Sequence, residues 1–431
     1  MCLGIRHCIG HLRRLSLMPQ SATHSQKFPA EKGGPGARVR VRANGAATTA
    51  GCLCFSSVNN FRRIVDNRTN KVYDESLVVA VEDLDKRTGA AHFRALRGDM
   101  DSDVVVLTED EIRKTARLTP ELIRAVEDGF RVLAQGGVAT PAPMMFFLDA
   151  VNEVDVKAAW VRPWGEFSVK VATGFFDNPS HGLPSGNSIL LLLDALTGTT
   201  RAVLLEGGYL TTLRAGAAGA IAAKWLAPTT ARTLGVVGTG SLARCHALAL
   251  LMERALDCVT VYGRNVDRAD AFVGRLAQAT DAKVTRAATI QELMERCDLV
   301  VTCTSAHEIL VHSDWVHPGM HITAAGADAP GKQELDPEIL RRADRVVCDL
   351  RAQAISQGEC QHVADDLVNN TSIGLTELGD IVAGRASGRV RSDEVTVCDL
   401  TGVGIQDTAI ARYVVAKVLR EQRSDARERG N

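Results

Sequence analysis

The sequence predicts an α/β protein, with a doubly wound parallel sheet preceded by a mixed α+β domain. Two observations support this fold class. From residue 233 to residue 359, short apolar runs alternate with helical patterns, as in a parallel sheet whose strands are connected by helices. Before that region, residues 153–205 hold segments in which polar and apolar residues alternate, which is typical of antiparallel strands.

Composition narrows the class of protein further. A chain of 431 residues is long enough for two domains, and its net charge of −1 gives no general attraction to nucleic acid or to an anionic membrane. No apolar run approaches the roughly 20 residues needed to span a bilayer. The 11 cysteines are scattered without metal-ligand spacing. We therefore expect no metal site and a reducing compartment, the cytoplasm.

The first hundred residues differ from the rest. Residues 1–50 are basic, with Glu31 as the single acid, and we expect them to be disordered. They have the composition of a transit peptide, which would place the protein in mitochondria or plastids, and equally that of an extension from a misassigned start codon. Residues 51–100 show little periodicity, with one candidate strand at Ser76–Val81. We treat residues 1–103 as a disordered or weakly ordered leader.

Predicted order begins at Val104 with a short strand. Thr108 and Thr119 are expected N-caps, and Pro120 stands at the first position of a helix that should end at the glycines 136 and 137. Four antiparallel strands are expected after this helix, at residues 154–161, 167–176, 190–193 and 201–205.

A predicted helix at Thr211–Leu226 has an unusual composition, because Ala and Gly fill most positions from 215 to 223. Small side chains let another element approach closely, at some cost in helix propensity. Arg214 lies in the first turn of this helix, where a cation is unfavourable with the helix dipole. An anionic partner such as a substrate carboxylate explains this position, and so does a structural ion pair.

The motif that organises the chain follows the apolar run Thr233–Val237. It reads G-x-G-x-x-A and ends at Ala243, at the start of a helical pattern. The first glycine permits a tight turn, the second lets a pyrophosphate approach the backbone, and the helix N-terminus offers free N–H groups to phosphate. We therefore predict a Rossmann domain that binds NAD or NADP. The expected contacts are Gly238, Thr239, Gly240, Ser241 and Leu242.

Further predicted strands give the motif its structural context. They lie at residues 258–262, 283–286, 298–303, 321–325 and 345–349, with a helix at 266–278. An acid that binds the adenosine ribose is expected at the end of the second strand, where this chain has Tyr262-Gly263-Arg264-Asn265. Arg264 could accept a 2′-phosphate, which favours NADP, or it could stack on the adenine or face solvent.

A third stretch, Ile322–Leu335, carries a strand into a Gly-Ala-Asp turn. Asp328 therefore lies just beyond the carboxyl end of a parallel strand, the edge at which such sheets bind ligands. A carboxylate there could act as a general base toward an amine or a water, or it could hold the loop as an Asx-turn. Lys332 in the same loop either reaches the cofactor or is solvated.

From Val104 to Leu419, the chain resembles the ornithine cyclodeaminase and mu-crystallin family. The matching stretches follow the family's order and spacing: KVATGFFDNPSHGLPSGNSILLL, GGYLTTLRAGAAGAIAAKWLA, GVVGTGSLA, AAGADAPGKQELDPEIL and TGVGIQDTAIARYVVAKVL. The resemblance implies a homodimer, with a substrate-binding and dimerisation domain from residues 104–230 and 360–425 and a nucleotide domain from residues 231–359. Family activities include ornithine cyclodeamination, ketimine reduction and alanine dehydrogenation, all with hydride transfer at the α-carbon of an amino acid or its imine.

The resemblance also implies roles for single residues. Lys170 matches the lysine that binds the substrate carboxylate, Arg214 the arginine between substrate and cofactor, and Asp328 the catalytic acid. Ser185 matches a hydroxyl beside the cofactor, and Lys332 a lysine on the cofactor side. Thr304, Ala324 and Ala325 complete the predicted cofactor contacts.

Two departures from the family's pattern bear on the substrate. Ornithine cyclodeaminases have an arginine just after the proline-rich segment, where this chain has Met144-Met145, and a glutamate where this chain has Lys157. A dibasic substrate would meet a less acidic pocket, and two stretches, EVDVK and TGVGIQD, look closer to the ectoine-utilisation branch. We expect an ornithine cyclodeaminase-like enzyme with a small amino-acid substrate. A ketimine reductase, an amino-acid dehydrogenase and a non-catalytic NADP-binding protein are the alternatives.

Overall fold

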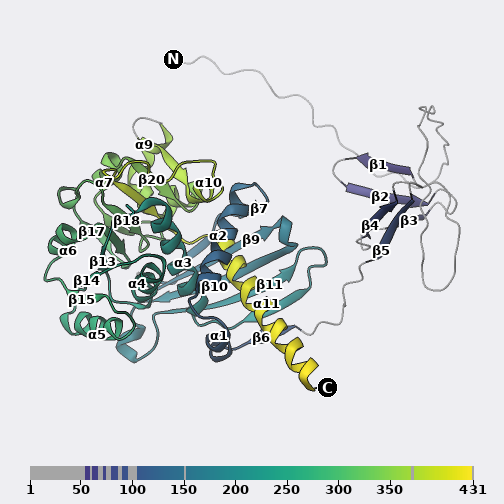
Figure 1. Ribbon diagram of the computed structural model, residues 1–431, viewed down its shortest axis with the longest axis horizontal. Coiled ribbons are helices and arrows are strands. Elements are labelled where there is room, and N and C mark those ends of the chain that lie inside the picture. The colour runs from purple at the N-terminus through teal and green to yellow at the C-terminus, as the bar shows by residue number, and fades with distance from the viewer. Residues whose placement is uncertain are drawn as a thin grey trace, which may run out of the picture. The chain divides into compact units, whose positions relative to one another are not determined.

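The computed structural model divides the chain into two compact units, residues 1–100 and residues 101–431 (Figure 1). It describes backbone at residues 54–58, 61–66, 71–73, 79–85 and 90–95, and then residues 104–149, 152–369 and 373–429. In the first unit, β1 (Cys54–Val58), β2 (Phe61–Asp66) and β3 (Lys71–Tyr73) form an antiparallel sheet, and β4 (Val79–Asp85) pairs with β5 (Ala90–Ala95).

Of these five strands, the sequence indicated only the candidate strand at Ser76–Val81, whose last three residues begin β4. The expected disorder of residues 1–50 lies outside the described residues. Among the described residues, none of the helices is both long and apolar enough to cross a bilayer.

A mixed sheet opens the second unit. Its strand order is β6-β12-β11-β10-β9-β7, with β8 also paired to β9. The strands are β6 (Val105–Leu107), β7 (Val138–Ala139), β8 (Met144–Phe147), β9 (Asn152–Val161), β10 (Glu166–Phe175), β11 (Gly186–Asp194) and β12 (Thr200–Leu204). All four expected antiparallel strands are present, each longer than or close to its predicted range.

The two faces of this sheet differ in chemistry. On one face, partners across the strands form apolar rows, for example Ala158–Val169–Leu191–Val203. On the other face, Lys157 lies directly opposite Lys170. Helix α11 (Gly404–Arg429), yellow in Figure 1, covers this second face, where Ser168 Oγ lies 2.7 Å from Thr408 Oγ1.

The helices of this layer begin where capping residues predict. Thr108 forms a capping box with Glu111 at the start of α1 (Glu109–Thr115), and Thr119 accepts from Leu122 N at the start of α2 (Pro120–Ala134). Helix α3 (Tyr209–Leu226) begins two residues earlier than expected. Arg214 therefore lies in its second turn, where the helix dipole is weaker, and the expectation of a first-turn cation was wrong.

The parallel sheet has eight strands in the order β15-β14-β13-β16-β18-β22-β20-β21. They are β13 (Thr233–Val237), β14 (Cys258–Tyr262), β15 (Lys283–Arg286), β16 (Leu299–Thr302), β18 (His321–Ala324), β20 (Arg345–Cys348), β21 (Leu375–Glu377) and β22 (Thr396–Asp399). From β13 the order runs outward in both directions, which is the doubly wound arrangement of a Rossmann fold. The predicted fold class is confirmed.

Helices cover both faces of the parallel sheet. The apolar cluster on one face includes residues of α3, α4 (Ser241–Glu253) and α5 (Val266–Ala277), and it continues into the core of the mixed sheet. The cluster on the other face includes residues of α6 (Ile290–Arg296), α7 (Pro337–Arg342), α8 (Arg351–Gln357) and α9 (Ala364–Val368). The remaining elements are β17 (His307–Val311), β19 (Gln333–Leu335), α10 (Leu378–Val382) and the 3-10 helices η1 (Arg162–Trp164), η2 (Asn178–His181), η3 (Ser313–Trp315) and η4 (Glu359–Val363).

The pairing of β21 and β22 moves one predicted boundary. Both strands lie after residue 359, in the segment expected to return to the first domain, yet both join the parallel sheet. Within residues 373–429 it is α11 that packs on the mixed sheet.

The glycines of α3 let α4 approach closely, because a Cβ at Gly219 would collide with the ring of His246. We predict that Gly219→Ala lowers the free energy of unfolding by about 1–3 kcal/mol, since overpacking outweighs alanine's better helix propensity. Gly274→Ala in α5 is the matched control, because a Cβ there meets no atom within 4 Å. It should stabilise the protein by about 0.4–1 kcal/mol in the same urea titration. Equal effects would contradict the close-approach explanation.

Candidate active site

The glycine turn after β13 has the geometry that the motif requires. Gly238 has φ +126°, and a Cβ there would lie 2.7 Å from the carbonyl oxygen of Cys303. Any other residue would be strained at this position. A Cβ at Gly240 would meet no atom within 4 Å, and Gly240 and Ser241 are exposed. The second glycine therefore leaves open space beside the backbone.

The N-terminus of α4 is suited to an anion. Gly240 offers no side-chain cap, and the first turn holds no acidic residue, so no described side chain caps the helix's first N–H groups and they can bind phosphate. Thr239 packs against Gly263 at the end of β14. Arg264 is exposed there, and Asn265 uses its side chain to cap α5. These features fit a dinucleotide whose pyrophosphate lies at the turn.

The other predicted cofactor positions lie along the same edge of the sheet. Thr304 follows β16, and Ala324 and Ala325 lie at the end of β18 and just beyond it. Strands β13, β16 and β18 are adjacent and parallel. Their carboxyl ends therefore lie within roughly 10 Å of one another, about two strand spacings. Asp328, four residues after β18, reaches this edge as expected.

Two buried cations share one carboxylate on the mixed-sheet side of the site. Lys170 Nζ donates to Asp407 Oδ1 over 3.0 Å, and Arg214 Nε lies 3.2 Å from the same oxygen. Arg214 also donates to Gln406 Oε1 over 2.8 Å. Lys170 is 1% exposed, so its ammonium group is shielded from solvent within the protein.

The charges of Lys170, Arg214 and Asp407 shift one another's pKa values. Burial lowers the pKa of Lys170, and the nearby Arg214 lowers it further, while Asp407 opposes both. Burial alone would raise the pKa of Asp407, but Lys170 and Arg214 together hold it below its usual value. Asp407 also lies in the first turn of α11, where a negative charge is stabilised by the helix dipole. This end of the site carries more positive than negative charge.

The opposite arrangement holds at the Asp328 loop, where two carboxylates share one ammonium. Lys332 Nζ donates to Asp328 Oδ1 over 2.8 Å and to Glu153 Oε1 over 2.9 Å. Burial would lower the pKa of Lys332, but these two acids raise it. Partial desolvation would raise the pKa of Asp328, but Lys332, with Lys157 and Arg214, keeps it below its usual value. Asp328 is therefore ionised at neutral pH, and its side chain is 44% exposed.

Lys157 lies between these two ends. Its Nζ is 2.9 Å from Asp155 Oδ2 and donates to the carbonyl of Thr401 over 3.2 Å. Its positive charge lowers the pKa values of both Asp328 and Asp407. The cationic and anionic ends therefore belong to a single polar cluster, which lies between the two sheets.

Not every predicted residue joins this cluster. Ser185 precedes β11 and contributes its carbonyl to Phe175 N, and Arg264 is exposed at the end of β14. No hydrogen bond links either side chain to the cluster among the described residues. Sequence reasoning missed Asp407 and Glu153. A signal for Asp407 was present, because TGVGIQD places an acid in the first turn of a helix beside a glycine-rich turn.

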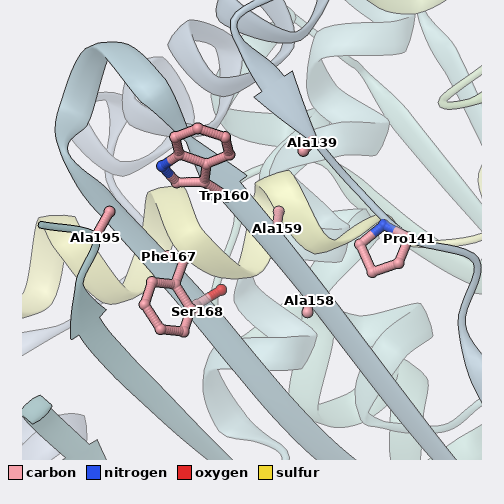
Figure 2. Close-up of a pocket in the computed structure, with 8 residues that line it drawn as sticks. All are labelled: Ala139, Pro141, Ala158, Ala159, Trp160, Phe167, Ser168 and Ala195. Carbon is pink, nitrogen blue, oxygen red and sulfur yellow. The ribbon is translucent and has the colours of Figure 1, made fainter. Parts of the chain in front are cut away.

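A hollow of about 440 Å³ lies elsewhere, beside the outward face of the mixed sheet, which is the apolar face that α11 does not cover. Figure 2 shows its lining: Ala139, Pro141, Ala158, Ala159, Trp160, Phe167, Ser168 and Ala195. Because Ser168 contacts α11, the adjacent Phe167 points away from that helix, as does its cross-strand partner Trp160. The hollow is apolar and separate from the charged cluster. In the described part of the chain, no group of His, Cys, Asp or Glu side chains is arranged to hold a metal ion.

Comparison with known proteins matches most of the second unit. The family model described as ornithine cyclodeaminase/mu-crystallin family matches residues 102–422. An uncharacterized cyclodeaminase of Sinorhizobium fredii is 36% identical over 328 residues, which cover 76% of this chain and 97% of that protein.

Solved structures agree in fold. An archaeal alanine dehydrogenase dimer with bound NAD is 32% identical, with a TM-score of 0.68 over 74% of this chain and 97% of that one. The Δ1-pyrroline-2-carboxylate reductase of Thermococcus litoralis, in complex with NADH and L-proline, is 25% identical, with a TM-score of 0.69 over 74% and 98%. The chain belongs to the ornithine cyclodeaminase/mu-crystallin family.

Proposed function

We propose that the protein is an NAD(P)-dependent enzyme that transfers hydride at the α-carbon of an amino acid or of its imine. The observation that carries this proposal is the separation of charge in the polar cluster. Among the described residues, Lys170 and Arg214 share the single carboxylate of Asp407, whereas Asp328 and Glu153 share the single ammonium of Lys332. One end is thus complementary to an α-carboxylate and the other to an α-ammonium or iminium group.

Lys170 and Arg214 would hold the substrate carboxylate. Lys170 Nζ has three N–H donors and uses one on Asp407, and Arg214 Nε, although ion-paired, has no hydrogen-bond partner in the described chain. Unused donors on buried cations are costly unless a ligand accepts from them. The dinucleotide would be held by the glycine turn and the N-terminus of α4, and when bound it accepts or supplies the hydride.

Asp328 would hold and move the proton on the substrate nitrogen. It is ionised, accessible, and already oriented by Lys332. A carboxylate so placed can accept a proton from an α-ammonium group as the carbon–nitrogen bond becomes an imine, and it can return the proton in the reverse direction. The presence of Lys170, Arg214 and Asp328 in one cluster favours turnover over a non-catalytic nucleotide-binding role.

The residue at position 157 favours a reductase or dehydrogenase over a cyclodeaminase. Cyclodeamination needs a second amine on the substrate, which must be held near the α-carbon. Here the inward face of β9 presents the Lys157 ammonium directly opposite Lys170, and Asp155 is already paired with Lys157. The positive charge of Lys157 would repel the side-chain ammonium group of a diamino substrate. With Arg264 exposed and no acid in residues 262–265 at the end of β14, NADP is the favoured dinucleotide.

We further propose that the protein is a homodimer that buries the outward face of the mixed sheet. Rows of apolar partners cover this face, and Trp160 is 40% and Val171 36% exposed. Contiguous exposed apolar surface can mark an interface. The solved alanine dehydrogenase to which the chain is similar is a dimer.

The function is tested with purified protein, both dinucleotides, and a panel of simple and diamino α-amino acids and α-oxo acids with ammonia. Stoichiometric cofactor conversion is expected, measured by the absorbance of the reduced nicotinamide. Ammonia release without net cofactor conversion would instead identify a cyclodeaminase. Tight dinucleotide binding with neither signal would contradict the enzymatic proposal.

Asp328→Asn is predicted to lower kcat by roughly 10²–10⁴-fold, because the amide cannot take up the proton. Dinucleotide affinity, measured by fluorescence titration, should stay within about twofold, since the phosphate contacts lie at the β13–α4 turn. Asp314→Asn, in η3 and outside the cluster, is the matched control and should leave kcat unchanged. Normal turnover in the Asp328 variant would remove this residue from the mechanism.

Lys157→Glu is predicted to raise kcat/KM for dibasic relative to neutral amino acids by at least about tenfold, or ~1.4 kcal/mol. The physical reason is that a side-chain ammonium would meet an acid in place of a cation. Lys157→Met, which removes the charge at similar length, should fall between the two. If both variants lose activity equally with every substrate, then Lys157 acts on the α-carboxylate and the specificity argument is wrong.

A double variant, Trp160→Asp and Val171→Asp, is predicted to convert the dimer to a monomer. The added carboxylates would have to be desolvated in the interface, which is costly. Light scattering coupled to size-exclusion chromatography gives the mass directly. Met252→Asp, at a 44% exposed position on α4, is the control and should leave the mass unchanged. A dimer that survives the double variant must use another face.

A further inference from the structure

Another buried carboxylate, Glu334, lies behind the site and is not part of the charged cluster. It is 0% exposed on β19. Its Oε1 accepts from Thr304 N over 2.7 Å, and its Oε2 accepts from Thr302 Oγ1 over 2.7 Å and from Gly326 N over 3.0 Å. Both oxygens are therefore occupied, and the three described residues that donate to them include no cation.

The three donors come from two loops that border the site. Thr302 ends β16 and Thr304 follows it, whereas Gly326 follows β18 and lies two residues before Asp328. The loops also touch directly, because a Cβ at Gly326 would collide with the Thr304 carbonyl oxygen. Glu334 thus joins the loop that carries Asp328 to the loop beside the glycine turn.

The position of Glu334 is itself fixed. Glu359, which is 1% exposed, accepts from Glu334 N over 2.7 Å and from Leu335 N over 3.2 Å. Burying a carboxylate is expensive unless its hydrogen bonds are complete. An apolar residue would fill this space at a lower desolvation cost, but it could not accept hydrogen bonds from the backbone N–H groups of Thr304 and Gly326. The carboxylate therefore does more than fill space in the core.

We propose that Glu334 is a positioning residue, which keeps Asp328 aligned with the dinucleotide edge by holding the loops after β16 and β18 together. The expected effect on the reaction rate rests on the proposed function. The contact between the two loops does not, and it can be tested without measuring enzyme activity. Misalignment by about 1 Å can cost roughly 10²-fold in rate.

Glu334→Gln tests this role. The amide has the shape of the carboxylate, but one of its acceptor oxygens becomes an NH₂ group, which would face a hydrogen-bond donor of Thr302, Thr304 or Gly326. We expect kcat to fall roughly 10–100-fold while dinucleotide Kd changes by less than about twofold. We also expect faster hydrogen exchange at the amides of Thr304 and Gly326, with the amides of β16 and β18 still protected. Glu334→Asp, which keeps the carboxylate, should recover part of the rate.

Glu166→Gln is the matched control, because this buried carboxylate lies at the start of β10 and pairs with Arg201. It should lower Tm without changing kcat. If Glu334→Gln behaves in the same way, or leaves exchange at Thr304 and Gly326 unchanged, the positioning role is wrong.

If Glu334→Gln fails to fold, a second variant, Thr302→Val, removes one of the donors to Glu334. This variant should still lower kcat severalfold, and an unchanged kcat would contradict the proposal. An inactive wild-type protein refutes the proposed function alone, and the exchange measurement still decides the role of Glu334.

Discussion

The carboxylate of Asp407 is the group on which the arrangement of the site depends. Lys170 comes from β10, Arg214 from α3 and Asp407 from α11, so their contact fixes a strand and two helices relative to one another. Removing a partner from a buried ion pair typically costs about 3–5 kcal/mol, because a charge is left without compensation. Here the loss of one acid would leave two cations, with Lys157 as a third positive charge directly across the strand from Lys170. The cluster is therefore held together tightly while it keeps donors that nothing in the described chain uses.

The two ends of the cluster come from different layers, and this explains how they are kept apart. The cationic end is built on the mixed sheet and the helices that cover it. The Asp328–Lys332 pair comes from a loop of the parallel sheet, and Glu153 of β9 reaches across to join it. An apolar cluster continues without interruption from the mixed sheet to one face of the parallel sheet. The core that stabilises the fold therefore also sets the spacing between the cationic and the anionic end of the cluster.

Much of this could be predicted from the sequence, and the rest could not, for physical reasons. Strands β13 and β14 begin and end where their apolar runs do, because strands buried on both faces carry a continuous hydrophobic signal. The burial of Lys170 could not be predicted, because polar–apolar alternation shows which residues share a face of a strand but not which face is covered. The helix that covers this face, α11, lies more than 230 residues away in the chain. Asp407 could not be paired for the same reason. The strands of residues 54–95 gave little periodic signal, and the return of β21 and β22 to the parallel sheet depends on long-range pairing that local patterns do not encode.

The pairing register of β9 with β10 has a consequence that extends beyond the site. Successive residues of a strand point to opposite faces, so the alignment that turns Lys157 and Lys170 toward α11 also turns Ala158 and Val169 the other way. Inserting or deleting a single residue in either strand would reverse both assignments in that strand at once. It would send a lysine into the apolar surface and hydrophobic groups into the polar cluster. A substitution in either strand therefore keeps this register, whereas a one-residue change within the paired segment loses it unless a β-bulge absorbs the change.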